Sequence, residues 1–169
     1  NIDGIVAAYQ KTTVKMVHED QHSACHDCVY SWYVDGVHYK EFNEQMEFTF
    51  TDLRTYEIRA VLHREGMPNI EKRARVVCRY IRREIRHLKQ DDLDRYFAAV
   101  RTVYETSREE GKLLYSENYQ DAGHFINYHT WMAGSKGCDH LHDGMGFLTG
   151  HNAITNEFEQ NLQRIDPTV

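Results

Sequence analysis

The first third of the chain alternates polar and apolar residues, which is the pattern of short β-strands. Residues 13–17, 30–34, 48–50 and 56–62 each place apolar side chains at every second position, as in a strand with one buried face. The dipeptide Asp35-Gly36, typical of tight hairpin turns, follows the second run. The pattern predicts a β-sandwich of short antiparallel strands over residues 1–66.

The pattern changes after the segment Gly66-Met67-Pro68-Asn69, because Gly and Pro interrupt both strand and helix periodicity. We therefore expect a domain boundary there, with residues 70–169 forming a second, mainly helical part. A first helix is expected where Val77, Tyr80, Ile81 and Ile85 have the spacing of one helical face. Its other face is expected to carry four arginines that are solvated or paired with acidic neighbours, namely Arg79, Arg82, Arg83 and Arg86.

Three more helices are expected downstream. Asp91 and Asp92 are suited to the start of the next one, and a third is expected between Tyr119 and Met132. The fourth should begin at His151. Apolar residues at helical spacing predict one buried face on the second helix and one on the fourth. The face of the second helix consists of Leu93, Tyr96, Phe97, Val100, Val103 and Tyr104. The face of the fourth consists of Ile154, Phe158, Leu162 and Ile165.

Charge and hydropathy exclude two classes of partner. The chain has 20 Lys and Arg against 26 Asp and Glu, a net charge of -6, which is modest and evenly spread and gives no nucleic-acid footprint. No apolar run approaches the roughly 20 residues of a membrane helix, so no membrane span is expected. No signal peptide is recognisable, and a start at Asn1 favours a processed or truncated chain.

The four cysteines are Cys25, Cys28, Cys78 and Cys138. An even number fits disulfides in an oxidising compartment, so we expect a secreted, extracellular or cell-surface protein. The CHDC sequence at 25–28, which His18 and His22 precede, could alternatively hold zinc. A disulfide within that loop, or two separate bridges, is the other interpretation.

Histidines are concentrated near the end of the chain, where five of the eleven lie between residues 124 and 151. On the third predicted helix His129 shares a face with apolar residues, whereas His124 does not. An imidazole on the core side of a helix costs free energy unless its nitrogens find partners. Convergence of His129, His142 and His151 therefore predicts a metal site.

The strand region resembles immunoglobulin-like and PKD-like domains. The resemblance lies in Trp32 in a central strand, the Asp-Gly turn, and the Tyr-x-Ile-x-Ala run that starts at Tyr56. In such domains the Trp fills the core and the Tyr tethers the start of its strand. Fewer than the usual seven or so strands are recognisable, so the first strands are expected to be missing.

The segment from Val77 to Val169 resembles the first half of a type-3 copper domain, as in tyrosinases, catechol oxidases and haemocyanins. The resemblance lies in CRYIRREIRHL at 78–88, the Tyr96-Phe97 pair, HDGMGFLTGH at 142–151 with its central Phe147, and Phe158-Glu159 followed by IDPTV. It implies half of a helical bundle with the first copper site. The implied ligands are His129, His142 and His151, with His124 and His140 as alternatives for the first two.

The sequence departs from that family in three places. Gly150-His151-Asn152 stands where the family has Trp-His-Arg. Some members crosslink a Cys to the second ligand as a thioether, whereas a disulfide between Cys138 and Cys78 is favoured here. Val169 also precedes the point where the family's second copper site begins, so one copper ion is expected from this chain and two in a complete site.

Two functions follow from these resemblances. The first is a fragment of an extracellular copper enzyme that oxidises phenols or catechols with dioxygen, which this chain alone could not do. The second is a structural or interaction component of a cell surface or extracellular assembly, with other protein chains as partners. A further histidine triplet beyond Val169 would discriminate between them.

Overall fold

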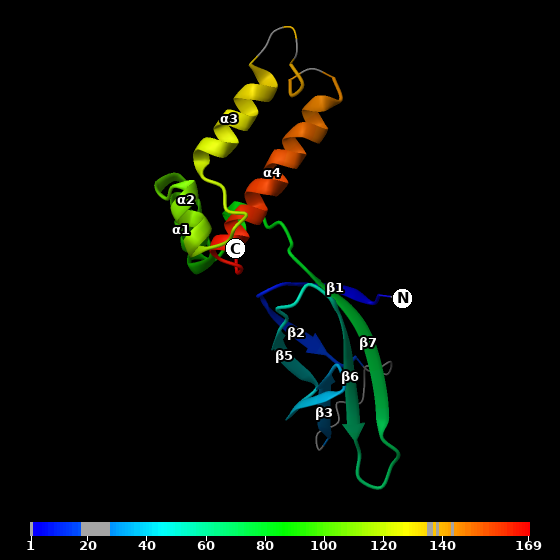
Figure 1. The fold of residues 1–169 in the computed structure, drawn as a ribbon. Coiled ribbons are helices and arrows are strands. Elements are labelled where there is room, and N and C mark those ends of the chain that lie inside the picture. Colours follow the sequence, from blue (N-terminus) through cyan, green and yellow to red (C-terminus); the bar gives the residue numbers. More distant parts are fainter. Residues whose placement is uncertain (1, 18–27, 135–136, 138, 143) are drawn as a thin grey trace. The chain divides into compact units, whose positions relative to one another are not determined.

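The chain folds as two units, the first built of strands and the second of helices (Figure 1). The computed structural model describes residues 2–17, 28–134, 137, 139–142 and 144–169. Its contacts divide the chain into Asn1–Arg82 and Arg83–Val169.

Seven strands are described in the first unit, in two sheets. One sheet has the order β1-β7-β6-β3-β4 and the other pairs β2 with β5. All neighbouring strands are antiparallel except β1, which is parallel to β7. The prediction of a purely antiparallel fold is therefore wrong for β1, while the prediction that earlier strands are missing stays a prediction. The strands are β1 Gly4–Ala7, β2 Lys11–Lys15, β3 Val29–Val34, β4 Val37–Phe42, β5 Gln45–Thr49, β6 Thr55–His63 and β7 Ile70–Arg79.

One hydrophobic cluster joins the two sheets. Trp32 from β3, Met46 from β5 and Phe50 are all at most 1% exposed and belong to it, which confirms the prediction that Trp32 fills the core. The backbone N–H of Asp52 donates to the hydroxyl oxygen of Tyr56 at 3.0 Å. The predicted tether at the start of the Tyr56 strand is thus confirmed, while the immunoglobulin- or PKD-like family stays a prediction.

The predicted turn at Asp35-Gly36 is confirmed. It joins β3 to β4 in a hairpin whose last paired residues are Val34 and Val37. Asp35 and Gly36 have φ angles of 50° and 79°, and positive φ at both central residues defines the two-residue turn that matches the twist of a hairpin.

The helix expected around Val77 to Ile85 is wrong, because residues 70–79 form β7. This strand pairs with β6 on one side and β1 on the other, so its backbone groups are satisfied within the sheet and tertiary pairing overrides the apparent helical spacing. Only a short 3-10 turn, η1 Ile85–His87, follows. The structure therefore divides the chain between Arg82 and Arg83, not at the Gly66–Asn69 turn.

The second unit contains α1 Gln90–Glu105, α2 Arg108–Leu114, α3 Ala122–Ala133 and α4 Gly146–Ile165. Helices α1, α3 and α4 occur where the sequence predicts them, although α4 begins before His151. Helix α2 was not predicted. Its signal is Ser107 followed by Glu110, since the Ser107 hydroxyl accepts from the backbone N–H of Glu110 at 3.2 Å, as in a helix N-cap.

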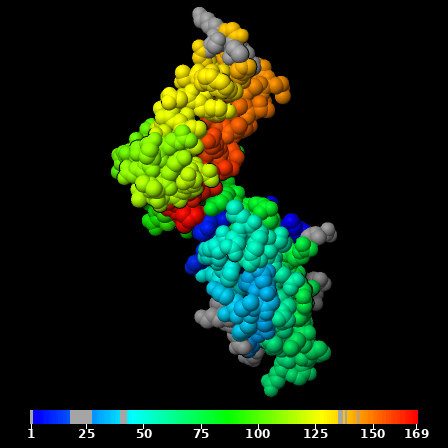
Figure 2. All heavy atoms as spheres, in the orientation of Figure 1, coloured from blue at the N-terminus to red at the C-terminus, as the bar shows by residue number. Residues whose placement is uncertain are grey.

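The core of the second unit is small. Ala99 and Val103 of α1 and Leu162 of α4 are buried, and Phe125 and Phe158 pack against them. The predicted buried stripe of α1 is wrong for Phe97 and Tyr104, which are 51% and 68% exposed. Helices α3 and α4 lie side by side, and their atoms meet on the face shown in Figure 2.

Polar contacts supplement this core. The carboxylate of Asp92, which is 9% exposed, pairs with Arg83 at 2.5 Å and also with Arg95. Arg86 pairs with Glu84, so the predicted pairing of these arginines with acids is confirmed for Arg83 and Arg86.

None of the helices in the described residues is long and apolar enough to cross a membrane.

Candidate metal centre

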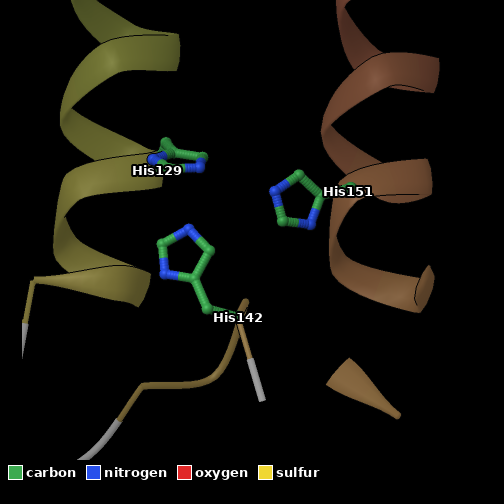
Figure 3. Close-up of side chains that lie close together, drawn as sticks. All are labelled: His129, His142 and His151. Atoms are coloured by element: carbon green, nitrogen blue, oxygen red, sulfur yellow. The ribbon is translucent and has the colours of Figure 1, made fainter. Parts of the chain in front are cut away.

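Three histidines from three different segments face a common space (Figure 3). His129 belongs to α3, His151 belongs to the second turn of α4, and His142 lies in the connection between these helices. One ring nitrogen from each lies within 4.8 Å of the others. The ring centroids are 5.5 Å apart for His129 with either partner and 6.0 Å apart for His142 with His151.

Asp139 orients His142. One carboxylate oxygen of Asp139 accepts from the backbone N–H groups of Leu141 and His142, each at 2.9 Å, and the other lies 2.8 Å from Nδ1 of His142. The backbone N–H of His142 is the main cause that lowers the pKa of Asp139. An ionised carboxylate only accepts hydrogen bonds, so Nδ1 of His142 carries the hydrogen and Nε2 presents its lone pair.

His151 is oriented in the same sense by its own helix. Its Nδ1 lies 2.8 Å from the carbonyl oxygen of Phe147, one turn earlier. Since a carbonyl oxygen can only accept, Nδ1 donates and Nε2 is the ligand atom. In metal sites, a partner of this kind on the second ring nitrogen fixes the tautomer and the ring orientation.

The segment before His142 is packed against α4. Leu141 is 1% exposed, and a Cβ added to Gly150 would lie 2.3 Å from its Cδ2 atom. A Cβ on Gly146 would lie 2.1 Å from the carbonyl oxygen of His140. Leu141 therefore leaves no space for a side chain at position 150.

The two alternative ligands lie elsewhere. His124 is on α3, but its Nε2 is 3.0 Å from a carboxylate oxygen of Glu157 on α4, and its ring stacks on Tyr128 with an angle of 4° between the planes. His140 is exposed, and its backbone N–H donates to the carbonyl oxygen of Met132 at 3.0 Å. Of the five histidines in this region, the structure brings together His129, His142 and His151.

The donor set fits a transition-metal ion. Imidazole nitrogens suit copper, zinc, iron and nickel, and three of them leave a coordination position open. Nitrogens bound at about 2.0–2.1 Å to one tetrahedral ion are about 3.3 Å apart, so the rings would close in from their present spacing. His142 has room to move, since its side chain is 49% exposed.

The cysteines divide between a disulfide and a free thiol. Cys28 is disulfide-bonded, which confirms the disulfide interpretation of the CHDC segment for this residue. Cys78 is a free thiol with 0% exposure, so the favoured disulfide between Cys78 and Cys138 is wrong, because Cys78 lies in the interior of the β unit. The partners proposed for them, Cys25 and Cys138, lie outside the described residues, as do His18 and His22 of the zinc alternative.

Sequence reasoning missed the residues that support the three imidazoles. Asp139 had a recognisable signal, because an Asp three residues before a His can accept from the following backbone N–H groups in a turn. The roles of Leu141 and of the Phe147 carbonyl had no such signal, since both depend on how the connection packs on α4.

Comparisons with known proteins do not identify the chain. No family model matches it, and no curated protein matches it. Among solved structures, a quinoprotein alcohol dehydrogenase-like protein from Bacteroides thetaiotaomicron is 12% identical with a TM-score of 0.35. The match covers 46% of this chain and 18% of that protein. This likeness carries no argument about fold or function.

Proposed function

We propose that this chain binds one copper ion through His129, His142 and His151. The observation that carries the proposal is the convergence of three imidazole nitrogens within 4.8 Å from three separate segments. The hydrogen bonds of His142 and His151 support it, because both leave Nε2 available. Among the described residues, this is the one group of three or more potential metal-ligating side chains that meets this distance.

Copper is favoured over other metals by the resemblance of HDGMGFLTGH at 142–151, which holds His142 and His151, to type-3 copper domains. Residues 78–88, which resemble that family's opening helices in sequence, form the end of β7 and a 3-10 turn and do not support the choice. Copper also forms the most stable complexes with nitrogen ligands among the divalent first-row ions. Zinc, nickel and iron share the same donor preference, so the choice of metal rests on the resemblance and is tested directly below.

We further propose that the site is half of a type-3-like centre in an extracellular protein that oxidises phenols or catechols with dioxygen. Copper would supply the change of oxidation state that such an oxidation requires. The residues of this chain would bind and orient the ion: Asp139 through His142, and the first turn of α4 through His151. Phe147, whose ring centroid is 4.8 Å from that of His151, is half exposed and could contact an aromatic substrate.

The alternative is a non-catalytic interaction component that reuses a sandwich and a helical module. A whole protein that holds this one triplet and no second one would favour it, because a dinuclear centre needs two. In this case the metal would stabilise the connection between α3 and α4, and other protein chains would be the partners.

Metal binding is the first test. The purified full chain, freed of metal with a chelator, is titrated with Cu²⁺, Zn²⁺, Ni²⁺ and Co²⁺ in separate calorimetric experiments. We expect one ion per chain, tightest binding for Cu²⁺, and nitrogen hyperfine structure in the electron paramagnetic resonance spectrum. Replacing His142 or His151 with Ala should reduce copper affinity at least ten-fold.

The matched control is His124→Ala, which removes an imidazole from the same region without touching the triplet. It should retain copper affinity within about three-fold, because its ring is paired with Glu157. Equal affinity in all three variants would show that the triplet is not the site. Tighter binding of Zn²⁺ than of Cu²⁺ would reject the copper assignment and leave a metal site.

A further inference from the structure

The contacts between α3 and α4 form a ladder that leads to the histidine triplet. At one end Gln120, just before α3, pairs with Asn161. His124 then pairs with Glu157 at 3.0 Å, and the rings of Phe125 and Phe158 meet with centroids 5.2 Å apart. His129 and His151 follow. The two helices are thus paired antiparallel, with the proposed metal site at the far end of the ladder.

The contact between Gln120, which precedes α3, and Asn161 of α4 is the most directional one in this series. Asn161 is 0% exposed, its Oδ1 accepts from the backbone N–H of Gln120 at 2.9 Å, and its Nδ2 donates to the carbonyl oxygen of Gln120 at 2.7 Å. Asn161 thus accepts one hydrogen bond from the backbone of Gln120 and donates another to it. Together the two bonds specify both the position and the orientation of the chain at Gln120.

Apolar packing alone would specify this register weakly. No residue of α3 is fully buried, and Ile126 and Trp131 on this helix are 57% and 76% exposed. A slip of one residue along a helix moves a side chain by about 1.5 Å and rotates it by about 100°. The three imidazole nitrogens lie within 4.8 Å, so such a slip would take a ligand out of reach.

Continuous helix links this contact to the ligands on both sides. Seven residues of α3, about 10 Å, lead from Ala122, two residues after Gln120, to His129, and ten residues of α4, about 15 Å, lead from Asn161 to His151. A register established at the Gln120–Asn161 rung is therefore transmitted to the two helical ligands. The His124–Glu157 rung lies between them and keeps the His124 imidazole away from the metal site.

We propose that Asn161 is a positioning residue for the three-histidine site, acting through the register of α3 and α4. This inference rests on the proposed function, because it assigns the residue a role in metal affinity. Asn161 does not touch the imidazoles, and a sequence search for ligands would pass over it.

The test compares Asn161→Leu with Asn156→Leu. Asn161→Leu keeps the number and branching of the side-chain heavy atoms and removes both hydrogen bonds to Gln120. Asn156 is exposed on the same helix and serves as the matched control. Copper affinity of the folded protein should fall about ten-fold or more in Asn161→Leu and stay within about two-fold in Asn156→Leu. The electron paramagnetic resonance spectrum of bound Cu²⁺ should change only in Asn161→Leu.

A second measurement needs no metal. His129→Cys and His151→Cys are combined in a Cys138→Ser background, and the crosslink that a short bifunctional thiol reagent forms between positions 129 and 151 is quantified by peptide mass spectrometry. The rate of this crosslinking should also fall about ten-fold when Asn161→Leu is added. If Asn161→Leu does not fold, Asn161→Ala, which adds no atoms to the interior, replaces it in both measurements.

The outcomes separate the two proposals. A lower midpoint of unfolding with unchanged copper affinity, spectrum and crosslinking would show a purely structural role and overturn the positioning role. If the unmodified chain binds no copper but crosslinking still depends on Asn161, the proposed function fails and the control of helix register stands. If crosslinking is also independent of Asn161, both proposals fail.

Discussion

Each of the two units has its own kind of interior, and the two interiors differ. The β unit buries Trp32, Phe50 and Met46 almost completely in one cluster shared by both sheets. In the helical unit the fully buried apolar cluster consists of Ala99, Val103 and Leu162. Large apolar side chains there remain exposed, among them Leu113 at 88%, Trp131 at 76% and Met145 at 77%.

This difference shows where each unit obtains its specificity. In paired strands, every second side chain points to the same face of the sheet, so large apolar residues are buried together there. Burial of apolar surface is the main contribution to the stability of the folded state. The helical unit relies more on directional polar contacts, such as the pairing of Asp92 with Arg83 and of Asn161 with Gln120. Polar contacts with defined geometry can also orient metal ligands, which an apolar core does not do by itself.

The largest expected effect is the loss of the β core. Trp32→Ala should lower the free energy of unfolding of the β unit by about 3–5 kcal/mol, since it leaves a large cavity at a side chain that is 1% exposed. Hydrogen exchange of β6 peptides at increasing urea measures the change. Trp131→Ala, at a side chain that is 76% exposed, is the control and should stay within about 0.5 kcal/mol.

A loss below about 1 kcal/mol in Trp32→Ala would remove the contrast between the two units. It would mean that the β core tolerates a cavity by collapsing around it, and that its dense packing does not dominate its stability.

A smaller effect is expected from the ion pairs of Asp92. Hydrogen bonding from Arg83 lowers the pKa of Asp92 below its usual 3.8. A lowered pKa in the folded state stabilises the protein above the ordinary carboxyl pKa, and this contribution is lost as the pH falls through the lower folded value. Asp92→Asn should therefore cost about 2 kcal/mol at neutral pH.

The free energy of unfolding of the helical unit is measured in urea, with hydrogen exchange of α1 peptides as the probe. The measurement is repeated between pH 3 and pH 7, a range that includes the usual carboxyl pKa. The difference between Asp92→Asn and the unmodified chain should shrink toward the acid end. A difference that is constant with pH would show that Asp92 contributes by packing and not by its charge.

The smallest effect concerns the reactivity of one thiol and no change in stability. Burial raises the pKa of Cys78, and the residue is 0% exposed. We expect iodoacetamide to leave Cys78 unmodified in the native protein and to alkylate it in urea, as seen by peptide mass spectrometry with glutathione as the reactive control. Rapid alkylation of native Cys78 would show that the β core opens readily.

Part of this structure could be predicted from local pattern. Strand periodicity located β3 and β6, the Asp35-Gly36 dipeptide predicted the hairpin turn, and helical spacing located α1 and α4. These succeed because period and turn geometry depend on neighbouring residues only. The exposure of Phe97 and Tyr104 was missed, since a stripe of apolar residues does not reveal how wide a face its neighbours cover.

Strand β7 shows the limit of the same reasoning. Its apolar residues are compatible with either a helix or a strand, and the choice depends on pairing with β6 and with β1, which lies about seventy residues earlier. The unit boundary moved with it, because a strand held on both sides belongs to the sheet and not to the helical unit that follows.

The sequence by itself determined which side chains are available to bind a metal, namely a dense set of histidines near its end. It also determined the periodicity that places His129 and His151 on helices. Only the tertiary structure decided that these two meet His142 and not His140, and that His124 pairs with Glu157 instead. The physical reason is that the selection depends on the register of α3 against α4 and on the packing of Leu141 on Gly150. The first is a contact between segments 41 residues apart, and the second depends on how the connection folds back onto α4, so neither follows from a local periodic pattern.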